Sequence, residues 1–490
     1  MAHEPRIVAF LCDGCAYQAA DRAGQAKLTY PQSLLTVRVM CTGRVEPAFV
    51  LQAFREGADG VLVAGCHPGD CRYVDGNLRA AARHALLARA LEQAGIEPAR
   101  LRIAWASGNE AARFAALVTE MTEALRALGP LDYRARALDE VEEAIRLAPH
   151  RLDGIEAPVP APSATRPKVA FYWNASCGGC EEAVMDLGEG LAGLLQRVDV
   201  VLWPVALDHK RADVEALPDG SIDVAFVNGA VRLTEQDEWA QLLRRKARIV
   251  VAFGACAHLG GVVGLGNLSE RQELLDAAYR APASVSNPEG PLPGEPVQVG
   301  GHDLSLPVLL SRALPLADVV EVDYTLPGCP PSPPLIEDAL AKLLGVGPLP
   351  PRGAVLAPSA SLCETCPRVG SRPEVLEISA LRRLATTALD PERCFLAQGL
   401  VCLGPGTRQG CQPGCVEAGM PCRGCFGPLD GVRDAGAAML SAFASLLAGS
   451  EADRARLAEE LVDPAGTFWR YSFAAGLLPR RPRPDGKERA

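Results

Sequence analysis

The sequence predicts an α/β protein built from more than one folded unit. Apolar segments with strand character alternate with helical periodicity twice along the 490 residues, before and after a Pro- and Ala-rich stretch at 151–167. Hydrophobic residues make up 48% of the chain and charged residues 22%, as in folded globular proteins. A chain of this length has room for two or three units, each with its own hydrophobic core.

The first unit, residues 1–150, alternates strands with helices. We expect strands at 6–11, 35–40, 60–64 and 101–106, and helices at 47–57, 77–94, 109–128 and 131–147. The Pro and Ala residues at 151–167 favour a semi-rigid extended linker over a packed element.

The second unit, residues 168–350, repeats the alternation, which predicts a largely parallel sheet. We expect its strands at 169–173, 198–203, 222–227, 249–253 and 319–324. The Pro- and Gly-rich stretch at 281–304 predicts a loop excursion. Residues 351–450 have little regular patterning apart from an Ala-rich helix at 431–447, and 451–490 are expected to form a C-terminal tail.

The charge and hydropathy of the chain argue against several functional classes. A net charge of −10 and a pI near 5.4 argue against a nucleic-acid-binding surface. The N-terminus has no pattern of a secretory or twin-arginine signal, and no apolar run is long enough to span a membrane. We therefore expect a cytoplasmic protein that contacts other proteins or small molecules.

The 17 cysteines are the strongest functional signal. Reducing cytosol would not maintain a disulfide framework, so metal ligation is the better explanation. They fall into groups of five, four and eight along the chain. The groups are Cys12, Cys15, Cys41, Cys66 and Cys71; Cys177, Cys180, Cys256 and Cys329; and Cys363, Cys366, Cys394, Cys402, Cys411, Cys415, Cys422 and Cys425.

The middle group follows the ends of predicted strands. Cys177 and Cys180 flank two glycines directly after one strand, and Cys256 and Cys329 follow two later strands. Because the carboxyl ends of parallel strands meet at one edge of a sheet, these four thiols should form one cage. Free backbone N–H groups of the Gly-rich turn can hydrogen-bond sulfide, so the cage suits an iron–sulfur cluster or zinc.

The first group also follows strand ends, and its five thiols exceed the four ligands that a [2Fe–2S] or [4Fe–4S] cluster needs. Which thiol is left over stays open. The eight C-terminal cysteines make two sets of four, typical of a ferredoxin-like module with two [4Fe–4S] clusters or of paired zinc ribbons. They divide either sequentially or in a nested way, with Cys363, Cys366, Cys422 and Cys425 in one set.

Longer motifs carry a family resemblance. The segments WNASCGGCEEAVMDL, FGACAHLGG, YTLPGCPPSP, LCETCPR, LVCLGPGTRQGC and MPCRGCFGPLDGVRD resemble the small (gamma) subunit of cytosolic [NiFe]-hydrogenases of the methyl-viologen-reducing (F420-non-reducing) and F420-reducing types. The segments FLCDGCAY and VRVMCTGRVEPAFVLQAFREGADGVLVAGCHPGDC resemble the delta-type iron–sulfur subunit of the methyl-viologen-reducing enzyme. The chain thus resembles a fusion of the two subunits.

The resemblance implies a flavodoxin-like domain at 168–350, a ferredoxin-like two-cluster module at 351–450 and a delta-type [2Fe–2S] domain at 1–150. It also implies a proximal [4Fe–4S] cluster on the middle group and medial and distal [4Fe–4S] clusters on the last eight cysteines. The implied function is electron transfer from H2 oxidation. Hydrogen would be split on a separate nickel–iron large subunit, and a heterodisulfide-reductase-like flavin/iron–sulfur partner, at which electrons bifurcate, would accept the electrons in a hetero-oligomeric complex. Two alternatives remain: a zinc-stabilised scaffold and a complex I-like quinone oxidoreductase small subunit.

Overall fold

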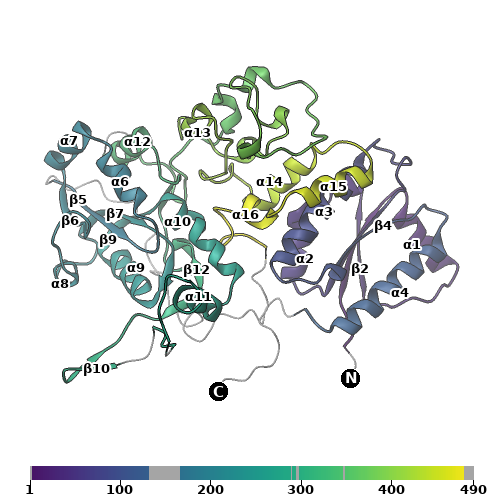
Figure 1. Cartoon of the computed structure of the whole chain (residues 1–490), viewed down its shortest axis with the longest axis horizontal. Coiled ribbons are helices and arrows are strands. Elements are labelled where there is room, and N and C mark those ends of the chain that lie inside the picture. Colours follow the sequence, from purple (N-terminus) through teal and green to yellow (C-terminus); the bar gives the residue numbers. More distant parts are fainter. Residues whose placement is uncertain (1–2, 132–165, 289, 294–296, 346–347, 479–490) are drawn as a thin grey trace.

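Two parallel sheets lie on either side of the C-terminal third of the chain (Figure 1). The computed structural model describes residues 3–131, 166–288, 290–293, 297–345 and 348–478. All but the first residue of the predicted helix at 131–147, and most of the linker, fall outside these ranges. Within them, no helix is both long enough and apolar enough to cross a membrane.

The N-terminal unit is a four-stranded parallel sheet in the order β2-β1-β3-β4. All four strands lie within one residue of the predicted bounds: β1 Ile7–Cys12, β2 Leu34–Val39, β3 Gly60–Gly65 and β4 Leu101–Trp105. One face is covered by α1 Ala16–Gln25 and α4 Ala111–Leu128, and the other by α2 Pro47–Arg55 and α3 Gly76–Gln93. The helix α1 was not predicted.

The second unit is a five-stranded parallel sheet in the order β13-β9-β7-β5-β6. Its strands are β5 Lys168–Trp173, β6 Asp199–Leu202, β7 Ile222–Asn228, β9 Ala247–Phe253 and β13 Tyr324–Leu326. Core residues of α6 Gly179–Met185, α7 Glu189–Arg197 and α12 Pro333–Leu343 cover one face, and those of α9 Thr234–Lys246 cover the other. The prediction of an α/β protein with parallel sheets is confirmed.

The last predicted strand of this unit was largely wrong. Residues 319–323 form a turn after the short 3-10 helix Leu316–Asp318, and only Tyr324 of the predicted strand belongs to β13. The reason is Asp323, whose buried carboxylate accepts a hydrogen bond from the Val250 amide at 2.8 Å and pairs with Arg244 at 2.7 Å. A carboxylate held in this way fixes a turn at the sheet edge instead of a continuous strand.

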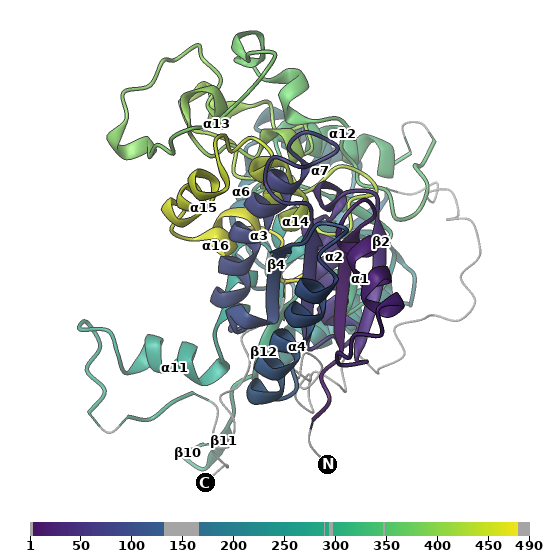
Figure 2. The same ribbon diagram turned by 90° about the vertical axis from the view of Figure 1, so that its right-hand side faces the viewer.

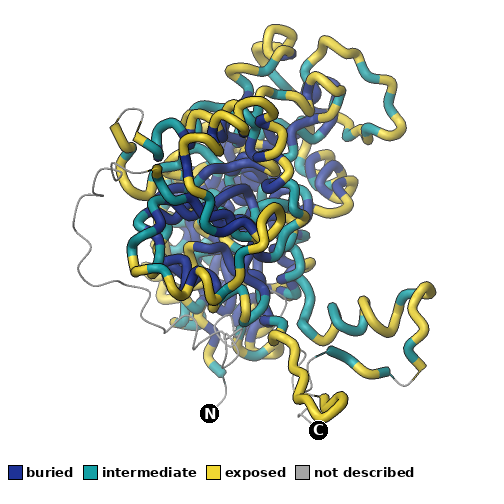
Figure 3. The backbone as a smooth tube through the Cα atoms, turned by 90° about the vertical axis from the view of Figure 1, so that its left-hand side faces the viewer, coloured by how far each residue is buried: buried dark blue, intermediate teal, exposed yellow. Residues whose placement is uncertain are grey.

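The predicted loop excursion is an arm that contains a small hairpin. The strands β10 Val297–Val299 and β11 His302–Leu304 pair antiparallel, and all their residues are exposed. With α11 Arg271–Tyr279, which buries no residue, the arm extends away from the body (Figure 3). Smaller elements of this unit are α8 Arg211–Glu215, α10 Gly254–Leu259, the 3-10 helix Val262–Leu268, and the antiparallel pair β8 Val231–Leu233 and β12 Leu309–Leu314.

The cysteine-rich third is built from short turns until its last helices. Its 3-10 turns are Leu362–Thr365, Val369–Ser371, Leu384–Thr386, Leu396–Gln398 and Gly404–Gly406, and the single-turn helix α13 is Gly414–Glu417. Three helices follow: α14 Ala435–Ala444, α15 Glu451–Glu460 and α16 Pro464–Phe468. The predicted tail therefore does not hold for residues 451–478, which are folded.

These C-terminal helices form a joint with the N-terminal unit. Residues of α2 and α3 share one hydrophobic core with residues of α14, α15 and α16, and Figure 2 shows α3 beside them. Across the joint, the Arg89 guanidinium donates hydrogen bonds to the carbonyls of Ala458, Glu459 and Leu461 at the end of α15. The first and last parts of the chain thus pack as one body.

Candidate metal centres

The middle four cysteines meet at one edge of the second sheet. Cys177 lies between β5 and α6, Cys180 lies in the first turn of α6, Cys256 lies in α10 after β9, and Cys329 follows β13. Burial raises the pKa of the Cys180 thiol, and repulsion from Cys256, Cys329 and Cys177 raises it further. Burial also raises the pKa of Cys256 to about 12, with Cys329 and Cys177 adding to the effect. The structure thus brings all four thiols together, as the strand pattern predicted.

Two of these sulfurs lie where the side chains of neighbouring residues would be if those residues were not glycines. Gly254 has φ +84° and Gly261 has φ +57°, both in the left-handed region that favours glycine. A Cβ on Gly254 would overlap the Cys180 sulfur, and one on Gly261 would overlap the Cys256 sulfur. The lack of a side chain at these two positions therefore lets the backbone pass close to the Cys180 and Cys256 sulfurs.

We expect Gly254→Ala to displace the Cys180 sulfur and to lower the iron content of the purified protein. The matched control is Gly353→Ala, because Gly353 has nearly the same φ, +82°, but has nothing within 4 Å of an added Cβ. Both variants carry the strain of a left-handed alanine, about 1–2 kcal/mol, and only the first adds the clash. Equal iron content in the two variants would contradict the proposed crowding at this site.

The five N-terminal thiols also gather at strand ends. The Sγ atoms of Cys12 and Cys66 lie 3.8 Å apart, and those of Cys41 and Cys71 lie 3.9 Å apart. Burial raises the pKa of Cys66 to about 12, and a hydrogen bond and repulsion from Cys15 contribute to the rise. All five thiols therefore belong to one cluster of side chains, and the geometry singles out none as the spare.

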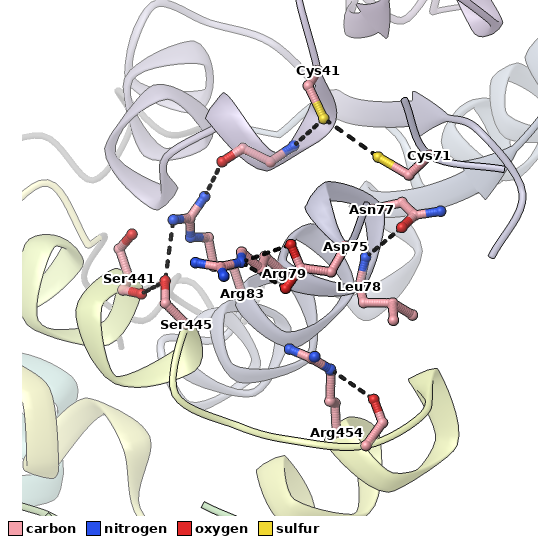
Figure 4. A network of polar contacts seen from close by, with 12 residues as sticks. Cys41, Cys71, Asp75, Asn77, Leu78, Arg79, Arg83, Ser441, Ser445 and Arg454 are labelled. Atoms are coloured by element: carbon pink, nitrogen blue, oxygen red, sulfur yellow. Dashed lines mark hydrogen bonds and ion pairs between the residues drawn. The ribbon is translucent and has the colours of Figure 1, made fainter. Parts of the chain in front are cut away.

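Backbone N–H groups point at these sulfurs. The Gly43 amide donates to the Cys41 sulfur at 3.4 Å (Figure 4). Burial would raise the pKa of Cys71, but hydrogen bonds from the Tyr73 and Asn77 amides outweigh it and hold the pKa below its ordinary value. Such donors favour the thiolate, which is the form that binds iron.

The first four C-terminal cysteines along the chain are Cys363, Cys366, Cys394 and Cys402. Burial raises the pKa of Cys363 to about 11, and repulsion from Cys366 and Cys394 contributes to the rise. An added Cβ on Gly404 would lie 3.3 Å from the Cys363 sulfur and 3.7 Å from the Cys402 sulfur, so the same turn borders both.

The last four C-terminal cysteines are Cys411, Cys415, Cys422 and Cys425. Burial raises the pKa of Cys425, and the thiols that raise it further are Cys422, Cys329, Cys411 and Cys415. Cys422, however, lies near both groups, because repulsion from Cys415 and from Cys366 raises its pKa. Both the sequential and the nested division of the eight cysteines therefore stay open.

Cysteines of neighbouring groups lie close enough to raise one another's pKa. Cys329 of the middle group is close enough to Cys425 to raise its pKa, and both thiols raise the pKa of Tyr471, which burial already raises, to about 12. Similarly, partial burial raises the pKa of Cys402, and the nearby Cys422 raises it further. Three cysteine groups therefore follow one another from the second sheet into the C-terminal third.

The donor set suits an iron–sulfur cluster. Thiols on turns with free backbone N–H groups and close glycines are what such a cluster needs from a protein. Within the described ranges, no three His, Cys, Asp or Glu side chains converge on a point for a single metal ion.

Comparison with known proteins adds two family matches. Residues 7–129 match the family described as the delta subunit of methyl-viologen-reducing hydrogenase. Residues 177–343 match the family described as the 20 kDa subunit of NADH ubiquinone oxidoreductase.

Among individual relatives, the G-type iron–sulfur subunit of the F420-non-reducing hydrogenase from Archaeoglobus profundus is 35% identical over 321 residues, covering 64% of this chain and 98% of the relative. The chain belongs to the family of F420-non-reducing hydrogenase iron–sulfur subunits. The D-type iron–sulfur subunit of the same organism is 49% identical over 130 residues, covering 26% of this chain and 95% of the relative. The A-type subunit of ferredoxin:CoB-CoM heterodisulfide reductase from Methanosarcina mazei is 41% identical over 143 residues, covering 28% of this chain and 18% of the relative. This hydrogenase protein therefore joins a D-type and a G-type sequence in one chain.

Sequence reasoning missed a buried acid that supports the first cysteine turn of this hydrogenase subunit. The carboxylate of Glu181, directly after Cys180, accepts hydrogen bonds from the Trp203 indole and from the Asn228 amide. Asn228 in turn accepts a hydrogen bond from the Ser176 hydroxyl at 2.9 Å. An acidic residue in the first turn of a helix was the available signal, but its partners lie on other strands.

It also missed an arginine that connects the N-terminal thiols to the joint. The Arg83 guanidinium donates to the Gly43 carbonyl at 2.6 Å and to the Ser445 hydroxyl at 3.3 Å (Figure 4). The turn that donates to the Cys41 sulfur is thereby tied to α14. No local sequence pattern signals this contact, because its ends lie 362 residues apart.

Proposed function

We propose that this chain is the electron-transfer subunit of a cytosolic group 3-type [NiFe]-hydrogenase. The observation that carries the proposal is the row of cysteine groups, which runs from the second sheet through the C-terminal third. The chain is also similar to proteins named as iron–sulfur subunits of hydrogenases, which supports the same function. In this role the chain connects H2 oxidation on another subunit with a separate electron acceptor.

Each cysteine group is assigned one cluster. Cys177, Cys180, Cys256 and Cys329 hold the proximal [4Fe–4S] cluster; Cys411, Cys415, Cys422 and Cys425 hold the medial one; Cys363, Cys366, Cys394 and Cys402 hold the distal one; and Cys12, Cys15, Cys41, Cys66 and Cys71 supply the ligands of a [2Fe–2S] cluster. When bound, these clusters supply one-electron transfer. The flavodoxin-like domain at 168–350, the ferredoxin-like module at 351–450 and the delta-type domain at 1–150 are part of the same proposal.

The protein's own residues hold these groups in place and tune their environment. Amides such as those of Gly43 and Tyr73 donate toward sulfur, and all but three of the thiols are at least partly buried. The shared core of α3 and α14–α16 fixes the N-terminal group relative to the C-terminal ones. A fixed arrangement matters because electron transfer requires the carriers to stay close together.

The partners follow from the relatives. A separate large subunit would carry the nickel–iron site, since the proposal assigns all the cysteine groups to clusters. A 143-residue part of this chain is similar to a protein named as a subunit of heterodisulfide reductase. This similarity supports a heterodisulfide-reductase-like flavin/iron–sulfur partner, where electrons would bifurcate. The assembly would be a cytoplasmic hetero-oligomer.

A complex I-like quinone oxidoreductase small subunit is the second candidate. The family match over residues 177–343 favours it. The eight cysteines after Cys329 and the D-type N-terminal unit favour the hydrogenase instead.

Metal analysis of the anaerobically purified chain tests the proposal. We expect a brown protein with about 14 iron atoms and matching acid-labile sulfide, the content of three four-iron clusters and one two-iron cluster. A colourless protein that carries zinc without sulfide would refute it in favour of a zinc-stabilised scaffold.

A further inference from the structure

A cavity of about 550 Å³ lies between the cysteine-rich turns and the last two helices. Its walls come from three stretches of the C-terminal third before α15 and from the α15–α16 region. Nothing in the electron-transfer role uses this cavity, and its chemistry differs from that of the cysteine groups.

Four arginines line the cavity: Arg382, Arg383, Arg423 and Arg470. Across the described residues, none of their guanidinium groups forms an ion pair with a carboxylate; Arg470 donates only to the Gly466 carbonyl, at 3.2 Å. These groups belong to a chain of net charge −10. A concentration of uncompensated positive charge in a hollow of an acidic protein calls for an anionic ligand.

The acids in the lining are already engaged. Glu460 pairs with Arg456, which lies outside the lining. Asp463 accepts hydrogen bonds from the Gly466 amide at 2.8 Å and from the Gln93 side chain at 3.0 Å. Within the described ranges, neither carboxylate pairs with the four arginines. With four arginines and two acids in its lining, the cavity has a net positive charge.

The rest of the wall is apolar. Leu381, Leu384, Leu400, Val401 and Leu461 line it beside the arginines, and Leu400 and Leu461 are themselves buried. Arginine guanidinium groups donate paired hydrogen bonds to phosphate oxygens. Leucine and valine side chains can pack against a flat apolar ring. The volume is also in the range of sites that bind small ligands and cofactors.

We propose that this cavity binds a phosphate-bearing nucleotide, with its phosphates on the arginines and its base against the leucines and valine. The ligand would lie beside the cysteine sets, because Val401 and Arg423 are the sequence neighbours of Cys402 and Cys422. An acidic protein segment is the competing occupant. The volume and the apolar wall favour the nucleotide.

Titration calorimetry of the full-length protein with ADP, pyrophosphate and adenosine tests the site. We expect ADP to bind, pyrophosphate to compete with it and adenosine alone to bind at least about tenfold more weakly, since charged hydrogen bonds to phosphate supply most of the affinity. The double variant Arg382→Ala/Arg383→Ala and the single variant Arg470→Gln should each weaken ADP binding about tenfold or more. The matched control is Arg433→Gln, because Arg433 is an exposed arginine of the same third that does not line the cavity.

Circular dichroism and the visible spectrum should be unchanged in all three variants. If the double variant does not fold, Arg470→Gln and the pyrophosphate competition still decide the question. Absence of ADP binding to the wild type, or equal ADP affinity in the cavity variants and Arg433→Gln, would overturn the proposal. Binding of poly-glutamate without binding of ADP would also overturn it and would assign the cavity to an acidic protein segment.

Discussion

Cys256→Ser, in complex with the large subunit, is expected to reduce hydrogen-dependent methyl viologen reduction to about 1% of wild type or less. Cys256 meets three other thiols at the edge of the second sheet, and serine cannot supply the thiolate that iron requires. Even changes outside the ligand shell of a metal site cost about 10- to 100-fold, so loss of a ligand should cost at least as much. The measurement is the initial rate of dye reduction under hydrogen.

The control for this variant is Ser284→Ala, at an exposed position of the arm and distant from every cysteine in sequence. It should keep the wild-type rate. Wild-type activity in Cys256→Ser, with the large subunit still bound, would contradict the assignment of Cys256 to the proximal site.

Cutting the chain within residues 132–165 is expected to leave the two fragments associated. The reason is the shared core of the joint, in which Leu86, Leu440 and Leu457 are fully buried, together with the three carbonyls that Arg89 binds. A protease site introduced in this stretch, followed by size-exclusion chromatography, makes the measurement. Separation of the fragments after cleavage would show that the covalent connection, and not the joint, holds the N-terminal unit.

Leu457→Asp should release the cleaved fragments, because a leucine-to-alanine change in a core already costs about 2–5 kcal/mol and an unpaired buried charge costs more. The matched control is Val375→Asp, since Val375 is 74% exposed and its replacement introduces the same charge at the surface. The cleaved Val375→Asp protein should elute as one species.

Much of the fold was predictable because strands and helices follow from the local pattern of apolar, polar and turn residues. The strands of the first sheet are apolar runs bounded by turn residues, and β3 Gly60–Gly65, buried throughout, was found to within one residue. Cys177 and Cys180 could be placed because parallel topology sends every strand end to the same edge. The gathering of the middle four thiols follows from the same rule.

The parts that were missed depend on contacts between distant residues. Val319 and Val320 look like a strand but are buried in a turn, because Asp323 pairs with Arg244 on another element. The sequence of α15 is highly charged, which is typical of a solvent-exposed segment. Its apolar residues nevertheless pack against α3 and belong to the shared core, and no local pattern indicates that contact. The division of the last eight cysteines between two sets likewise depends on which turns meet in space, and the spacing along the chain leaves it open.

The visible absorption of the assembled complex under hydrogen tests the central claim most directly. We predict that the iron–sulfur absorption of the wild-type chain bleaches when hydrogen is admitted, and that it stays unbleached in Cys256→Ser or when the large subunit is omitted. Isotope exchange between deuterium gas and water should confirm that the large subunit still splits hydrogen in the wild-type and Cys256→Ser complexes. An unbleached wild-type spectrum in a complex that splits hydrogen would contradict the account.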